Sequence, residues 1–520
     1  MKHIIGLIIS CLLCLLIICT DQYIDNSSNI EKNFLIKQLK QDPNNILYTF
    51  DLAFIYQKLK KYDKAIVLYN KSKLLEGEKG WYSEYMLGKC YEALGDWENA
   101  FKYYNSAYHR FPIRAEPLYS LASHYFNENN HSKVCLYADI GRKIHLPENN
   151  NLFIEQDIYK YKFLELLSVS AYYDAHCRKN GTKYVDKLLF DLSLPKYVKE
   201  NSLRNLLFYV ENIENVNYIP MQVNTPLLCD WSIERYKPHN PSIVKTVTGY
   251  IVNCRSGNCV QWYPDYVVMD GTKMPKTKNI YIEYDKDLNK GFETLIMDDP
   301  SLLKYQTRTQ GLEDLRIFYF KNDIYFVATT CQLNLQGIPK MCIGKFELNK
   351  LDNIVSVNKV TLLEGPILER PEKNWMPLIV DGELLLIYSF GPYIIYKPNI
   401  ETGECKEFFK KNPLFDFSRF AGSAPPIPFD DGYLVMVHEG IWLDRKYYIH
   451  RFAYLDKNLE IKKVSKPFTF KHKGVEMCCG MVVNHSEDKL IMMVALEDRE
   501  AYFGLIDLSN VRSLLKNLSI

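Results

Sequence analysis

The sequence predicts a multidomain α + β protein, in which an N-terminal α-solenoid is followed by an all-β five-bladed propeller. Between about residues 30 and 200, the apolar residues follow a helical period and recur in units of 34 or 35 residues. From about 205 to 515, short runs rich in Val, Ile, Tyr and Phe alternate with turn residues, which is typical of many short strands. A chain of 520 residues also exceeds what one ordinary core supports, so several domains are expected.

Residues 1–20 have the pattern of a signal peptide or a signal anchor. A short basic start, Met1-Lys2-His3, precedes an uncharged apolar run of sixteen residues from Ile4 to Cys19. The run is shorter than the roughly 20 residues that cross a bilayer comfortably. We therefore expect a protein of the secretory pathway, either membrane-anchored or secreted, whose membrane contact is confined to this segment.

Small residues recur at fixed intervals in the helical half. One series is Ala53, Gly88 and Ala122, and a second is Ala65, Ala100 and Val134, with spacings of 35 and 34 residues in both. This spacing resembles tetratricopeptide repeats, helix pairs that stack into a solenoid. The helical pattern continues from Phe153 to Val198, which we expect to cap the repeats. The resemblance implies either a protein partner bound to the helical repeats or a solenoid that braces the neighbouring domain.

The β-rich half is expected to form a propeller rather than a large sandwich. Strong turn signals, Asp381-Gly382 and Asp431-Gly432, stand beside apolar runs. Roughly 60 residues per repeat would give about five four-stranded blades. Because blades surround a central channel, the polar clusters that interrupt the apolar runs are expected to converge there.

Composition excludes some functions and leaves others open. With 64 basic and 62 acidic residues the net charge is +2, so nucleic acid is not an expected partner. The aromatic content of 14% suits carbohydrate binding but also suits ordinary repeat cores. The 14 cysteines show no zinc-ligand spacing, and there is no glycine-rich phosphate loop, so neither a metal nor a cofactor is expected. Asp285-Lys286-Asp287 is expected to be a hairpin turn rather than a nucleotide-sugar site.

The segment Gly311-Leu312-Glu313-Asp314-Leu315-Arg316 places two acids and an arginine in a strand-like context. Alternation puts Leu315 and Ile317 on one face, Asp314 and Arg316 on the other, and Glu313 away from Arg316. A carboxylate beside a guanidinium can handle a sugar hydroxyl or a phosphate, or can be a structural ion pair.

Two motifs resemble glycoside hydrolase family 130, five-bladed propellers that include β-mannoside phosphorylases, and the related β-1,2-mannosyltransferases. The segment 311–316 is similar to the family's Gly-x-Glu-Asp-Pro-Arg. The second motif comprises Gly422-Ser423-Ala424-Pro425-Pro426-Ile427 with the later Val437-His438. The resemblance implies that Asp314 is the catalytic general acid, acting through a sugar hydroxyl. It implies that Arg316, Lys373 and His438 bind an anion.

The wider set of substrate-binding residues that we expect in the propeller funnel is Arg308, Glu313, Arg316, Lys373, Asn374, Trp375, His438 and Glu476. Trp375 would stack on a sugar, unless it packs inside a blade. Glu476 stands in an otherwise uncharged run and is expected to be a second buried acid that partners Asp314.

Two departures from the family pattern bear on the reaction. Leu315 replaces the proline, and Glu439 stands where a glycine follows the histidine. A glutamate beside a phosphate pocket would repel the anion, which favours a transferase or a lectin-like binder over a phosphorylase. The sequence thus predicts a glycosyltransferase or glycoside phosphorylase that acts on mannose-type glycosides and takes a glycan or sugar-phosphate substrate. The alternative is a non-catalytic scaffold that binds glycan and protein.

Overall fold

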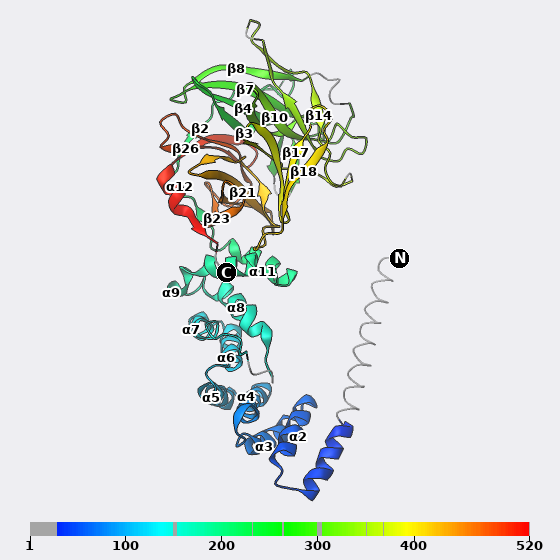
Figure 1. The fold of residues 1–520 in the computed structure, drawn as a ribbon, viewed down its shortest axis with the longest axis vertical. Coiled ribbons are helices and arrows are strands. Elements are labelled where there is room, and N and C mark those ends of the chain that lie inside the picture. Colours follow the sequence, from blue (N-terminus) through cyan, green and yellow to red (C-terminus); the bar gives the residue numbers. More distant parts are fainter. Residues whose placement is uncertain are drawn as a thin grey trace. The chain divides into compact units, whose positions relative to one another are not determined.

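The structure is a computed structural model (Figure 1). It describes residues 29–148, 153–230, 232–262, 265–298, 304–349, 351–367 and 369–518. The predicted signal segment, residues 1–20, lies outside the described residues. Among the residues that are described, no helix combines the length and the apolar composition that crossing a membrane would require.

Helices make up the N-terminal part of the described chain (Figure 1). After a helical stretch over residues 29–41, they are α2 (Ile46–Lys58), α3 (Tyr62–Ser72), α4 (Gly77–Ala93), α5 (Trp97–Arg110), α6 (Glu116–Asn127), α7 (His131–Gly141), the π-helix η1 (Ile158–Lys162), α8 (Phe163–Ser170), α9 (Ala175–Arg178), α10 (Gly181–Phe190) and α11 (Lys196–Leu206). A further helix, α12 (Leu508–Leu514), lies near the C-terminus. Side-chain caps begin several of them, since Asn45, Asp96 and Asn130 each accept a backbone N–H bond from the first turn of α2, α5 and α7.

The two small-residue series of the repeat lie at buried helix contacts. Ala53, Ala65, Ala100, Ala122 and Val134 are fully buried, and Gly88 is buried with them. Helix α4 packs so closely on α5 that a Cβ on Gly88 would lie 2.5 Å from the ring of Tyr104. The repeat therefore conserves spacing because each unit needs a small side chain where its two helices meet.

The chain divides into two compact units, Met1–Leu188 and Leu189–Ile520. The division falls within α10. Helix α11 begins inside the expected cap, which ended at Val198, and it lies in the second unit, where Lys199 forms an ion pair with Asp416.

The second unit is built from β sheets (Figure 1). One sheet contains β3 (Lys237–Lys245), β4 (Gly249–Gly257), β7 (Thr277–Asp285), β8 (Lys290–Asp298), β13 (Ile354–Val357) and β12 (Glu347–Asn349). The next contains β9 (Glu313–Phe320), β10 (Asp323–Thr330), β11 (Lys340–Lys345) and β14 (Val360–Leu362). A third contains β15 (Met376–Val380), β16 (Glu383–Phe390), β17 (Tyr393–Pro398) and β18 (Cys405–Lys411).

An eight-stranded sheet, a four-stranded sheet and a short hairpin complete this unit. The fourth sheet contains β1 (Glu211–Asn212), β19 (Ala421–Gly422), β20 (Ile427–Phe429), β21 (Gly432–Trp442), β22 (Lys446–Leu455), β23 (Ile461–Ser465), β24 (Phe468–Thr469) and β28 (Leu515–Asn517). The fifth contains β2 (Asn217–Pro220), β25 (Glu476–Val483), β26 (Lys489–Leu496) and β27 (Glu500–Asp507). The hairpin consists of β5 (Cys259–Trp262) and β6 (Asp265–Val268).

Neighbouring sheets meet in a closed, propeller-like ring. Strand β3 lies beside β9 and β25, β9 lies beside β15, β16 beside β19, and β22 beside β25. Strand β2 comes early in the unit and pairs antiparallel with the late strand β27, which joins the two ends of the β half. An apolar cluster fills each junction between sheets, represented by Phe326, Trp375, Val435, Met492 and Ile243.

We predict that Gly88→Ala destabilises the helical unit. Alanine favours helix by about 1 kcal/mol over glycine. The added methyl group would press on the Tyr104 ring, however, and overpacking costs about 1–3 kcal/mol, so a net loss is expected. Thermal unfolding of the full chain, followed by far-UV circular dichroism, measures the change. Ser106→Ala, at an exposed position of α5, is the matched control and should leave the melting temperature unchanged. Equal melting temperatures for both variants would contradict the prediction.

Candidate active site

Asp314 lies in a β-bulge at the start of β9. Arg316 pairs with Val327 of β10, whereas Glu313 pairs with Thr329, so the register shifts between them. Asp314 has a φ of 53°, the left-handed conformation that an aspartate adopts at a cost of about 1–2 kcal/mol. A bulge redirects a side chain, and the simple alternation predicted from the sequence fails at this residue.

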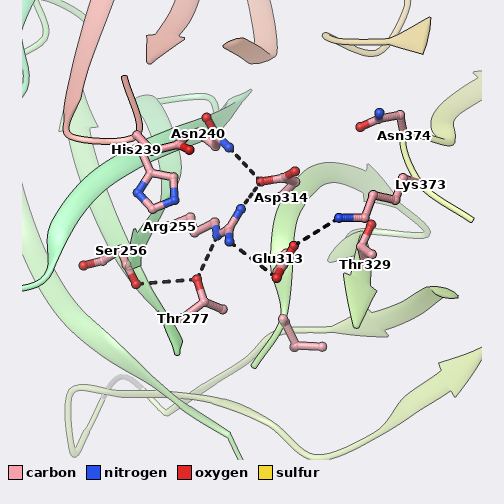
Figure 2. A network of polar contacts seen from close by, with 12 residues as sticks. His239, Asn240, Arg255, Ser256, Thr277, Glu313, Asp314, Thr329, Lys373 and Asn374 are labelled. Atoms are coloured by element: carbon pink, nitrogen blue, oxygen red, sulfur yellow. Dashed lines mark hydrogen bonds and ion pairs between the residues drawn. The ribbon is translucent and has the colours of Figure 1, made fainter. Parts of the chain in front are cut away.

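The Asp314 carboxylate is held by two groups from the neighbouring sheet (Figure 2). Its Oδ1 lies 2.6 Å from Nη1 of Arg255, at the end of β4, and accepts a hydrogen bond of 2.8 Å from Nδ2 of Asn240 on β3. Burial alone would raise the pKa of Asp314, but the charges of Arg255 and Arg316 outweigh burial and hold that pKa below its ordinary value. The side chain is 16% exposed, so an ionised oxygen remains within reach of a ligand.

Arg255 organises the charged cluster around Asp314 (Figure 2). Its Nη2 lies 3.6 Å from Oε1 of Glu313, and its Nε donates to Oγ1 of Thr277 at 2.8 Å. The other oxygen of Glu313 lies 3.6 Å from Nζ of Lys373, whose side chain is 48% exposed. The sequence analysis did not single out Arg255 as a partner of Asp314.

Arg316 joins two sheets and does not face a ligand. Its side chain is fully buried, its Nε donates to the carbonyl oxygen of Ser423 at 2.8 Å, and its Nη2 donates to the carbonyl oxygen of Gly422 at 3.1 Å. The same Nη2 lies 3.1 Å from Oδ1 of Asn374. This geometry corrects the anion-binding role that we predicted for Arg316, because its donors are committed to acceptors of the protein. Asn374 is likewise held by the protein.

His438 is a buried, uncharged residue. Its Nδ1 lies 2.9 Å from Oγ of Ser423. Burial first, then the neighbouring His450 and Arg316, lowers the pKa of His438 well below its ordinary value. A neutral imidazole does not attract an anion by charge, so the predicted anion-binding role is corrected to one of positioning.

Glu439 lies on the opposite side of β21 from His438, because successive side chains of a strand point to opposite faces. Its oxygens lie 2.9 Å from Nε of Arg451 and 3.1 Å from Nε of Arg419. The repulsion of phosphate that we inferred for Glu439 is therefore wrong. Its charge is balanced by two arginines away from the Asp314 cluster.

Three predicted substrate-binding residues lie outside the cluster. Trp375 is 1% exposed and packs edge-on against Tyr388 in an apolar core, so its ring is not available to stack on a sugar. Glu476 is buried and accepts the backbone N–H groups of residues 470–472, so it holds a turn and does not pair with Asp314. Arg308 is exposed, without a polar partner among the residues that the structure describes.

Four polar residues that the sequence analysis missed lie near the cluster. Nζ of Lys446 lies 4.4 Å from the centre of the Tyr448 ring, and Oη of Tyr266 donates to Asp498 at 3.2 Å. Burial and then the charge of Lys373 lower the pKa of Lys446, so the charges of the two lysines interact. The only signal for Lys446 and Tyr448 was their place beside a predicted strand, which does not distinguish a site residue from any other.

One group in the described part of the chain has ligand atoms close enough to hold a metal ion. Cys135, Asp174 and Cys177 bring theirs within 4.8 Å of one another in the helical unit. Asp174 already accepts hydrogen bonds from Ser132 and from the backbone of Cys177. This group is separate from the Asp314 cluster.

Comparisons with known proteins give similarities in both halves. Residues 82–112 match the tetratricopeptide repeat family. Beta-mannosyltransferase 1 of Komagataella phaffii is 29% identical over 130 residues, 23% of this chain and 20% of that protein. The match therefore spans about a fifth of the length of the curated relative. These matches confirm that the chain resembles repeat proteins and mannose-active enzymes, as the motifs predicted.

Solved structures with similar arrangements include two mannose-active proteins. A beta-1,2-mannobiose phosphorylase from Listeria innocua is 14% identical, covers 57% of this chain and 99% of its own, and has a TM-score of 0.38. MPT-1, a GDP-Man-dependent mannosyltransferase from Leishmania mexicana, is 11% identical, covers 56% of this chain and 90% of its own, and has a TM-score of 0.35.

We predict that Glu439→Gln strongly destabilises the β unit. The substitution leaves Arg451 and Arg419 without the carboxylate that compensates their buried charges, and breaking such a pair costs about 3–5 kcal/mol. Urea unfolding of the full chain measures the loss. Glu383→Gln is the control, because Glu383 pairs with Lys397 on the surface, where an ion pair contributes about 0–1 kcal/mol. Similar losses in both variants would contradict a structural role for Glu439.

Proposed function

We propose that this chain is a glycosyltransferase or glycoside phosphorylase that acts on mannose-type glycosides. The observation that carries the proposal is the Asp314 carboxylate, kept ionised by Arg255 and oriented by Asn240, yet still exposed to a ligand. The motif resemblance and the similarity to beta-mannosyltransferase 1 support mannose as the sugar. Each of the five larger sheets would form one blade of the propeller.

Transfer requires a group that accepts a proton. A hydroxyl of the acceptor forms a bond to the anomeric carbon of the donor sugar, while the bond from that carbon to the leaving group breaks. The acceptor proton passes to the Asp314 carboxylate, directly or through a sugar hydroxyl. In the reverse reaction the same carboxyl must first be protonated, so one residue serves both directions. The lowered pKa of Asp314 means that the carboxylate form is the one present near neutral pH.

The leaving group of such a donor is anionic, and two lysines suit it. Lys373 is about half exposed, and Glu313 anchors its ammonium beside Asp314. Lys446, whose charge interacts with that of Lys373, contributes a second positive charge. A pair of ammonium groups stabilises the charge that develops on a departing phosphate or diphosphate.

A non-catalytic scaffold remains the second candidate, for a specific reason. Arg316 and His438, which the family resemblance implies for anion binding, are engaged by the protein. With fewer cations directed at a donor, the same cluster would suit a neutral glycan bound without turnover. The helical repeats would then supply the protein-binding surface.

Activity of the Asp314→Asn variant tests the proposal. The purified protein is incubated with mannose 1-phosphate or a nucleotide-mannose donor and with a manno-oligosaccharide acceptor. We expect Asp314→Asn to lower the rate by about a thousandfold, because the amide does not accept the proton. Asp381→Asn, at the exposed turn between β15 and β16, is the matched control and should retain the native rate. An unchanged rate in Asp314→Asn would overturn the catalytic role, and glycan binding without product from any donor would favour the scaffold.

Replacing Arg255 should shift the pH dependence of activity. Arg255→Gln removes the positive charge that most strongly lowers the pKa of Asp314, so that pKa should rise. Since the carboxylate is the active form, the acidic limb of the kcat/KM profile should move to higher pH. Arg178→Gln removes an exposed arginine of α9 and should leave the profile in place. An unshifted acidic limb in Arg255→Gln would show that Asp314 does not set it.

A further inference from the structure

A hollow of about 880 Å³ lies between the first sheet and the sheet of β9–β11, at the strand ends opposite to Asp314. Its lining includes Tyr281, Glu283 and Tyr284 of β7 and Tyr319 of β9. Asp314 and Tyr319 belong to the same strand and are five residues apart, about 17 Å at the rise of an extended chain. The hollow is therefore separate from the candidate active site.

This hollow continues into a second one of about 700 Å³. The two share Thr246, Val247, Tyr319 and Asn322. Tyr319, with a side chain that is 39% exposed, lies where they meet. Together they form an extended groove that suits a chain-like ligand better than a compact one.

The lining of the groove combines one exposed aromatic ring, that of Tyr319, with the carboxylate of Glu283. Tyr281 Oη donates to Oε1 of Glu283 at 3.0 Å, and the second oxygen of Glu283 has no hydrogen-bond partner among the described residues. Tyr281 and Tyr284 are themselves buried, so they support the lining and do not offer their rings or hydroxyl groups to a ligand.

Charge restricts the chemical class of that ligand. Four carboxylates and two ammonium groups line the larger hollow: Glu283, Asp285, Asp323, Glu347, Lys290 and Lys345. Two further ammonium groups, those of Lys245 and Lys321, line the second hollow, so the groove as a whole carries four of each sign. This balance favours a neutral ligand over an ion. Asp285 accepts bonds within its own turn and Asp323 pairs with Lys345, so few oxygens remain for a metal ion. A neutral ligand rich in hydroxyl groups fits best.

We propose that this groove binds a neutral oligosaccharide chain, with Tyr319 as the surface on which a sugar ring stacks and Glu283 as the acceptor for its hydroxyl groups. Aromatic faces and carboxylates are suited to the apolar and polar sides of a sugar. The hollow lies within the roughly 300–1,000 Å³ of ordinary ligand pockets. The choice of mannan as the chain rests on the proposed function, whereas the groove itself requires only a neutral glycan.

Native electrophoresis of the full-length protein in gels that contain soluble mannan tests this proposal. The mannan should slow the native protein, and Tyr319→Ala or Glu283→Gln should weaken the apparent affinity by about tenfold. Phe408→Ala removes a similarly exposed aromatic ring from another sheet, β18, and should behave like the native protein. Asp314→Asn should also be slowed normally, because it changes the separate active site.

The outcomes separate this inference from the proposed function. If Tyr319→Ala and Glu283→Gln are slowed as much as the native protein, the groove does not bind the glycan. The proposal also fails if neither mannan nor a second neutral glycan such as xylan slows the native protein. Loss of retardation in Asp314→Asn alone would assign glycan binding to the active site and would also overturn it. Retardation that depends on Tyr319 would support glycan binding in the groove. If the same protein had no transferase activity, the proposed function would fail and the groove would stand.

Discussion

Compensation of charge around Arg255 is the interaction on which the rest of the candidate site depends. A guanidinium that is mostly removed from water is costly unless carboxylates face it. Glu313 and Asp314 supply that charge from the next sheet, and Thr277 accepts the remaining Nε bond. Because these groups come from β4, β7 and β9, the cluster can form only after the two sheets have come together.

Arg316 provides the corresponding constraint on the other side of β9. Its bonds to Gly422, Ser423 and Asn374 connect the two family-like motifs directly. Gly311, which begins the first motif, has a φ of 98°, and a Cβ there would lie 2.5 Å from the carbonyl oxygen of Thr277. Most of the motif residues that resemble the mannose-active family therefore hold the sheets together. Only some of them could take part in a reaction.

The sequence predicted what depends on local pattern and missed what depends on distant partners. The repeat spacing located Ala53, Gly88 and Ala122, because helix contacts need a small residue at each period. The first motif located Asp314, and Lys373, which the family resemblance implied as an anion-binding residue, lies in the same cluster. The sequence did not predict the pairing of Asp314 with Arg255, since a bulge redirects the carboxylate and its partners lie far away along the chain.

The same geometry bears on the chemistry that Asp314 could perform. With Glu439 facing away, the charge near the cluster no longer argues against an anionic donor. What remains is the protonation state of Asp314, set by Arg255 and Arg316 against the opposing effect of burial. A carboxylate that stays ionised can accept the proton that an acceptor hydroxyl releases, and it must first be protonated if the reaction runs the other way. The charges around one aspartate thus decide the protonation state in which a reaction at this site would begin, whereas its net direction depends on the substrates.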